Sequence, residues 1–134
     1  GFEFVFSPYG VWPVAPADAA AGFGLHQAAL IGPWQEITRD RQEWAPLLRT
    51  CEVTLAGSNG EVRHGTGANA FGSPVLALKA IVDAIGANPD WSPIAAGEIV
   101  TTGTLTDLMP ARPGETWAYT VAGAPLRGLS VTLT

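Results

Sequence analysis

The sequence predicts an α+β fold, mostly β, in which one main helix at about residues 73–86 lies among about seven short strands. Three observations support this prediction. Short runs of aromatic and β-branched residues recur along the chain, an Asn-Gly pair marks a hairpin, and one long apolar pattern has helical spacing. A doubly wound parallel sheet is excluded, because it needs a helix after nearly every strand.

The composition describes an apolar, weakly acidic chain. Its 134 residues have the size of one domain, residues 1–134. Hydrophobic residues make up 47% and charged residues only 14%, so we expect large faces that are buried or covered in a homo-oligomer, a dimer or larger. The net charge is −5 and the seven Lys and Arg residues are scattered, which excludes nucleic acid as a partner.

The cellular location of the chain is predicted from its single cysteine and from the prolines and glycines that interrupt its uncharged stretches. Cys51 is the single cysteine, which excludes an internal disulfide and favours a cytoplasmic location. Two uncharged stretches, residues 4–17 and 19–35, are interrupted by prolines and glycines, so we expect no membrane-spanning helix and no membrane partner. No export signal is expected at the first residues either.

The first third of the chain gives weaker patterns. Residues 1–6, GFEFVF, favour a strand because they are rich in aromatic and β-branched types. We expect an irregular segment at 7–16, weak helical character at 17–24, a short buried strand from His26 to Pro33, and a helical turn within residues 34–44.

A hairpin is the clearest local prediction. From Leu48 the sequence RTCEVTLAG places Cys51, Val53 and Leu55 on one face at period two. Ser58-Asn59-Gly60 follows, and Asn-Gly is a strong signal for a tight turn, because both residues accept positive φ. The return strand is residues 61–66, and Cys51 is expected to be buried.

The main helix has recognisable ends. Ser73 is a good N-cap, Pro74 suits the first helical position, and Gly86 ends the pattern. Between them lies a wide apolar stripe, with Lys79 and Asp83 on the other side of the helix. Beyond it we expect three more strands, at residues 98–102, 116–121 and 129–134.

Two segments have the residue types of a ligand site. GTGANAFGSP, residues 65–74, joins a strand to a helix N-terminus, where backbone N–H groups and the helix dipole can hold a carboxylate or phosphate. IVTTGTLTDL, residues 99–108, gathers hydroxyl groups around Gly103. The alternatives are that the glycines only permit a tight turn and that threonine is common in strands; the spacing fits no nucleotide-binding fingerprint.

Taken together, these segments resemble one known family. GTGANAFGSPVLALKAIVDAIG, AGEIVTTGTLTDLMPARPGETW and LRGLSVTL follow in order, and ALIGP precedes them. They are similar to the 2-hydroxypentadienoate (2-keto-4-pentenoate) hydratase and 4-oxalocrotonate decarboxylase branch of the fumarylacetoacetate hydrolase superfamily, in its C-terminal part. The resemblance implies a mixed β roll, and a chain that matches a truncated catalytic domain of this family.

The resemblance also implies a site. A small carboxylic acid, a 2-oxo or 2-hydroxydienoate acid, would bind at six residues: Thr102, Gly103, Thr104, Gly67, Asn69 and Gly72. In the family a divalent cation, Mg²⁺ or Mn²⁺, is held by three acidic side chains and acts as a Lewis acid on the bound acid. Glu3 matches one of these acidic positions, whereas Gly1 stands at another.

Three readings of the function therefore remain open. The chain is a metal-dependent hydratase- or decarboxylase-like lyase, or a non-catalytic relative without metal that serves as a carboxylate-binding or assembly subunit, or a fragment of a longer hydratase. The third acidic motif and the family's lysine have no counterpart here, and no catalytic residue is assigned. His26 and His64 are expected to be structural histidines, and the five tryptophans to fill core or interface.

Overall fold

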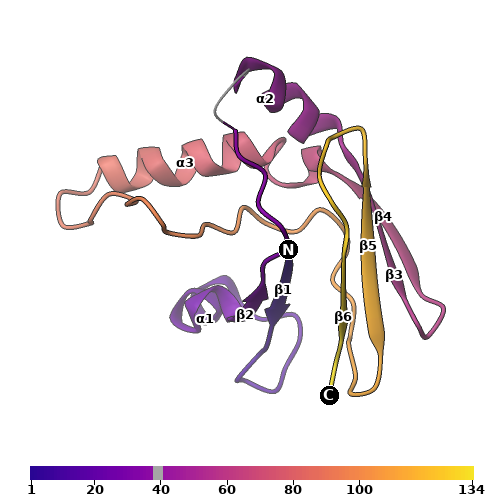
Figure 1. The fold of residues 1–134 in the computed structure, drawn as a ribbon. Helices are drawn as coiled ribbons and strands as arrows, with labels where there is room; N and C mark the ends of the chain where they lie inside the picture. Colours follow the sequence, from indigo (N-terminus) through magenta and orange to yellow (C-terminus); the bar gives the residue numbers. More distant parts are fainter. Residues whose placement is uncertain (38–40) are drawn as a thin grey trace. The chain divides into compact units, whose positions relative to one another are not determined.

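A computed structural model describes residues 1–37 and 41–134 of the chain. Figure 1 shows its elements in chain order. The chain divides into two compact units, Gly1–Pro33 and Trp34–Thr134. The prediction that residues 1–134 form a single domain stays a prediction.

The first unit is a two-stranded antiparallel ribbon with two short helices. Its elements are β1 (Phe2–Val5), α1 (Pro16–Ala21), the 3-10 helix η1 (Phe23–Leu25) and β2 (His26–Leu30). In β1 and β2, Phe2 lies opposite Leu30 and Glu3 opposite Ala29. The strand predicted at residues 1–6 is confirmed, and the weak helical pattern at 17–24 becomes α1 and η1.

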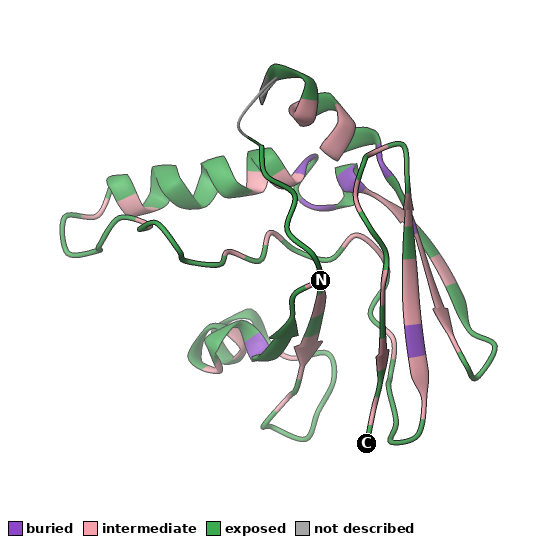
Figure 2. Ribbon diagram, viewed as in Figure 1, coloured by how far each residue is buried: buried purple, intermediate pink, exposed green. Residues whose placement is uncertain are grey.

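The burial predicted for the strand that begins at His26 is wrong. All five residues of β2 are exposed (Figure 2). The physical reason is that a two-stranded ribbon leaves both faces of its strands accessible unless another layer covers them. Leu25, just before the strand, is the buried apolar side chain at this place, 8% exposed.

The second unit is built on a four-stranded antiparallel sheet with the order β4-β3-β5-β6. Its strands are β3 (Glu52–Gly57), β4 (Val62–Thr66), β5 (Thr116–Ala122) and β6 (Leu129–Thr132). The predicted hairpin is confirmed as β3 and β4: Gly60 has φ +87°, and the backbone N–H of Glu61 donates to Asn59 Oδ1 at 3.0 Å. The strands predicted after residue 115 are confirmed as β5 and β6.

The two faces of this sheet differ as the alternation predicts. Val53 and Trp117 are buried on one face, 8% and 4% exposed, and the Trp117 Nε1–H group donates to Glu115 Oε2 at 3.1 Å. On the other face, Thr54 Oγ1 and His64 Nδ1 lie 3.1 Å apart across the β3–β4 pair. Cys51, immediately before β3, is 2% exposed, so its predicted burial is confirmed.

Two helices and a 3-10 turn accompany the sheet: α2 (Arg41–Thr50), η2 (Gly67–Asn69) and α3 (Pro74–Gly86). The main helix predicted at 73–86 is confirmed as α3, and the Ser73 side chain accepts a hydrogen bond from the N–H of Val75, as an N-cap does.

The strand expected to begin at Leu48 is wrong at its start. Helix α2 continues to Thr50, whose hydroxyl donates to the carbonyl of Pro46, and the N–H of Cys51 donates to Leu47 O. Part of the helical turn predicted within 34–44, residues 38–40, lies outside the described residues.

A strand predicted at residues 98–102 is also wrong. The Glu98 side chain and backbone instead close a turn, since Glu98 N–H donates to Ala95 O and Ala95 N–H donates to Glu98 Oε2. Across residues 1–37 and 41–134 the structure therefore has six strands and remains an α+β, sheet-rich fold with one main helix.

Helix α3 leaves its apolar stripe uncovered. Each of its large apolar side chains at positions 75, 76, 78, 81 and 82 is between 39% and 50% exposed (Figure 2). By length and composition alone, residues 67–86 could cross a membrane. However, the continuous α-helix has 13 residues, or about 20 Å, which is short of the roughly 30 Å hydrocarbon core.

Candidate carboxylate-binding site

The glycine-rich and threonine-rich segments, predicted to form one site, lie against each other in the second unit. The Asn69 side-chain amide donates to the carbonyl of Leu105 at 2.8 Å. Gly65 packs against the same carbonyl so closely that a Cβ atom on Gly65 would lie 1.7 Å from the oxygen. Segments about 40 positions apart in the sequence are thus joined at Leu105.

Gly67 and Gly72 shape the glycine-rich loop. Gly67 is buried, its N–H donates to Cys51 O at 3.0 Å, and a Cβ atom there would lie 1.7 Å from Leu48 O. Gly72 has φ +81°, which side chains disfavour. Gly67 therefore lets two backbone segments approach closely, and Gly72 permits a turn with positive φ.

Gly103 is the point of the threonine-rich segment that faces the loop. Its φ is +106°, and a Cβ atom on it would lie 3.9 Å from the Cβ of Ala70. The structure therefore places Gly103 beside the loop that contains Gly67, Asn69 and Gly72.

The backbone donors predicted to hold an anion are largely used within the loop. The N–H groups of Gly72 and Ser73 donate to Ala68 O and Ala70 O, each at 2.9 Å, and the N–H of Val75 donates to Ser73 Oγ. A group that donates inside the loop offers little to a ligand. A carboxylate at this place would depend more on side chains, and on the Gly103 backbone, than on the helix N-terminus.

The polar side chains of the two segments differ in the hydrogen bonds that they can still make with a ligand. The Asn69 amide has a second N–H besides the one used for Leu105. Thr104 uses its hydroxyl hydrogen to donate to Thr106 O at 2.7 Å, so it can only accept from a ligand. Thr102 is half-buried.

Glu3, the predicted metal ligand, lies on β1 in the first unit, where its carboxylate meets a histidine. Glu3 Oε1 is 2.7 Å from His26 Nδ1, and the pair shares one face of the ribbon formed by β1 and β2. Within residues 1–37 and 41–134, no three His, Cys, Asp or Glu side chains gather closely enough to hold a metal ion. A hard divalent ion takes about six oxygen ligands, so these residues do not fit such an ion on their own.

Arg49 is a residue that the sequence patterns did not single out. It lies in the last turn of α2, and its carbonyl oxygen is 3.1 Å from the position of a Cβ atom on Gly67. This distance places the backbone of Arg49, and not its guanidinium group, beside the loop. No local pattern marks it, because its proximity to Gly67 depends on how α2 enters the sheet.

The remaining polar predictions have mixed outcomes. His26 and His64 each bond a neighbouring side chain, as expected of structural histidines. Trp117 fills the core, whereas Trp12, Trp34 and Trp91 are exposed, which leaves the interface alternative for these three residues. Their predicted role at an interface stays a prediction.

Comparison with solved structures shows what fold these elements form. The chain is similar to 4-oxalocrotonate decarboxylase from Pseudomonas putida G7, complexed with magnesium and adipate: the TM-score is 0.73 and the identity 22%, over 98% of this chain and 47% of that chain. This chain has the fold of the fumarylacetoacetate hydrolase superfamily. The resemblance read from the sequence to the decarboxylase branch of this superfamily is confirmed.

A second structure of that decarboxylase, complexed with calcium and acetate, matches with a TM-score of 0.55 and 28% identity, over 65% of this chain and 32% of that chain. The chain thus spans about half the length of the first of these two decarboxylase structures. No protein-family model and no curated protein sequence matches it. The roles given to Thr102, Gly103, Thr104 and the loop residues stay predictions.

Proposed function

We propose that this chain is a hydratase- or decarboxylase-like lyase domain that binds a 2-oxo or 2-hydroxydienoate carboxylic acid. The observation that carries the proposal is the match of 98% of the chain to 4-oxalocrotonate decarboxylase at a TM-score of 0.73. The activity, substrate and partners of a whole enzyme are proposals for this chain, because it spans 47% of that structure.

The proposed binding site lies between the glycine-rich loop and Gly103. The Asn69–Leu105 hydrogen bond holds the two segments together and supports the proposal. The second N–H of Asn69 and the hydroxyl of Thr102 would donate to the carboxylate, and the bare backbone of Gly103 would let it approach.

Metal dependence is the part of the proposal that the donor set does not support. The related decarboxylase was solved with magnesium and with calcium. In this chain Glu3 bonds His26, and the described residues include no cluster of three metal-binding side chains. The described side chains therefore do not supply a metal-binding site by themselves.

A second function is favoured by the lack of a cluster of three metal-binding side chains among the described residues. A non-catalytic relative that binds carboxylic acids without metal, as a subunit of a larger assembly, needs the loop but not the three acidic ligands. The uncovered apolar stripe of α3 supports assembly with further copies of this chain or with another protein.

Calorimetry separates the two functions. Oxalate, a planar mimic of a 2-oxo acid, is titrated into the chain with and without magnesium or manganese, and turnover of 2-hydroxypentadienoate is followed by its absorbance. The lyase predicts metal-dependent oxalate binding and turnover. The non-catalytic subunit predicts binding that is independent of metal and no turnover, and absence of oxalate binding in every arm contradicts both.

A further inference from the structure

The first unit contains a shallow, open hollow of about 350 Å³. Its lining includes Phe6, Tyr9, Gly22, Phe23, His26 and Gln27. All of these residues belong to the first unit, so the hollow is defined without reference to the rest of the chain.

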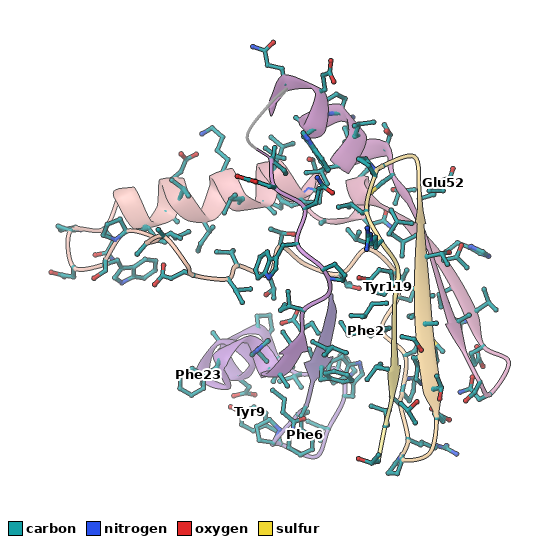
Figure 3. All side chains as sticks on the ribbon, viewed as in Figure 1. Phe2, Phe6, Tyr9, Phe23, Glu52 and Tyr119 are labelled. Atoms are coloured by element: carbon teal, nitrogen blue, oxygen red, sulfur yellow. The ribbon has the colours of Figure 1, made fainter. Side chains whose placement is uncertain are left out.

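Three aromatic rings of this hollow are open to solvent. Phe6, Tyr9 and Phe23 are 59%, 42% and 89% exposed, and Figure 3 labels all three on the first unit. Tyr9 is held in place by its hydroxyl, which donates to Asp18 O at 2.9 Å. Exposed rings around one hollow offer faces on which a flat ring can stack.

Phe23 combines two unfavourable features. Its ring is almost fully exposed, and its backbone has φ +55°, a conformation that bulky residues rarely adopt. Such strained residues persist where the surroundings enforce them, and they cluster at ligand sites. This second observation is independent of the hollow itself.

His26 gives the hollow a polar side chain whose Nδ1 is already bonded. Its Nδ1 lies 2.7 Å from Glu3 Oε1, and an ionised carboxylate only accepts hydrogen bonds, so Nδ1 carries the hydrogen. In the neutral ring the other nitrogen, Nε2, then has a lone pair and can only accept. A ligand that bonds His26 through Nε2 must therefore donate.

We propose that this hollow binds a small, flat aromatic molecule that carries a hydrogen-bond donor, such as a phenolic hydroxyl group. The exposed rings of Phe6, Tyr9 and Phe23 stack on the ligand, and His26 Nε2 accepts a hydrogen bond from the ligand's donor group. A free carboxylate is a poor ligand here, because it cannot donate and because it would lie near the charge of Glu3. The site goes beyond the proposed lyase activity, which concerns the loops of the second unit.

Phenol is the probe that tests the proposal, with anisole as the matched compound that lacks the donor. Both are titrated at pH 8 into the ¹⁵N-labelled full chain and followed by amide chemical shifts. We expect phenol to shift the amides of residues 22–27, with a Kd in the region of 1 mM for a ligand of this size. Anisole should bind about fivefold more weakly, the effect of one hydrogen bond.

Three variants locate the binding. Phe23→Ala should weaken both compounds, and its exposed position means that the fold does not depend on the ring. His26→Ala should reduce phenol to the affinity of anisole and leave anisole unchanged. Trp91→Ala removes another exposed ring, 54% exposed and outside the hollow, and should change neither affinity.

Several results would overturn the proposal. Equal affinities for phenol and anisole would remove the role of His26, as would ring ¹⁵N shifts that place the hydrogen on Nε2. Changes in amide chemical shift that are spread evenly over the chain would show that phenol does not bind specifically in the hollow. Concentration-dependent self-association abolished by Phe23→Ala would show that a second copy, and not a ligand, covers the rings.

Discussion

Replacing Gly65 with alanine tests the junction on which the candidate site depends. The added Cβ atom would lie 1.7 Å from Leu105 O, 2.6 Å from Leu105 C and 3.1 Å from Thr106 N. Ordinary contact begins at 3.4 Å, so the segment must move by 1.7 Å. Gly65 cannot move away from Leu105 without disturbing β4, where it pairs with Val53.

The size of the effect follows from two contributions. Overpacking of this kind costs about 1–3 kcal/mol. Movement of Leu105 also breaks its 2.8 Å hydrogen bond from Asn69, which contributes about 1 kcal/mol. We therefore expect Gly65→Ala to lower the free energy of unfolding by about 2–4 kcal/mol.

Urea denaturation followed by tryptophan fluorescence measures this loss. With a slope of about 1.5 kcal/mol per molar, the midpoint should fall by roughly 1.3–2.7 M. Gly86→Ala is the matched control, because nothing lies within 4 Å of its Cβ position. It should raise stability by up to about 1 kcal/mol, since alanine favours helix. A loss below about 0.5 kcal/mol in Gly65→Ala would refute the contact with Leu105.

Three further predictions follow from other parts of the chain. Ser73→Ala removes the N-cap of α3 and should lower the free energy of unfolding by about 1 kcal/mol in the same urea assay; an unchanged midpoint would show that the cap contributes nothing. The hydrogen bond from Trp117 is the main cause that lowers the pKa of Glu115, so this carboxylate stabilises the fold above its unfolded pKa, and the contribution disappears as the pH falls through the lower folded pKa. Urea midpoints between about pH 5 and pH 3 should thus fall less in Glu115→Gln than in the natural chain, and equal falls would contradict this. Leu78→Glu places a charge in the uncovered stripe of α3 and should shift the chain from an oligomer toward its 13.9 kDa monomer in light scattering; a natural chain that is already monomeric would contradict the predicted assembly.

Much of the fold could be predicted from local sequence because local interactions fix it. The Ser58-Asn59-Gly60 turn and the Ser73-Pro74 helix start each satisfy their backbone groups within a few residues. The strand predicted at 98–102 is absent because a local interaction decides the structure there too. Its β-branched residues are typical of a strand, but a turn closed by Glu98 satisfies the backbone of Ala95 and Glu98 instead.

The candidate site could be predicted only in part. The resemblance singled out Gly67, Gly103 and Asn69, and the structure brings their segments together at Leu105. The pairing of Glu3 with His26 could not be predicted, because it depends on the register of β1 and β2, which is shifted between Phe4 and Val5. No local pattern fixes such an irregularity.

A titration of the ¹⁵N-labelled chain with oxalate tests whether a carboxylic acid binds between the glycine-rich loop and Gly103. We expect saturable shifts of the amides of Gly67, Gly72 and Gly103. Thr102→Val should weaken binding about fivefold by removing one donor, whereas Thr120→Val, an exposed threonine on β5, should leave it unchanged. Amide shifts that are absent, or that cluster away from these glycines, would contradict this binding.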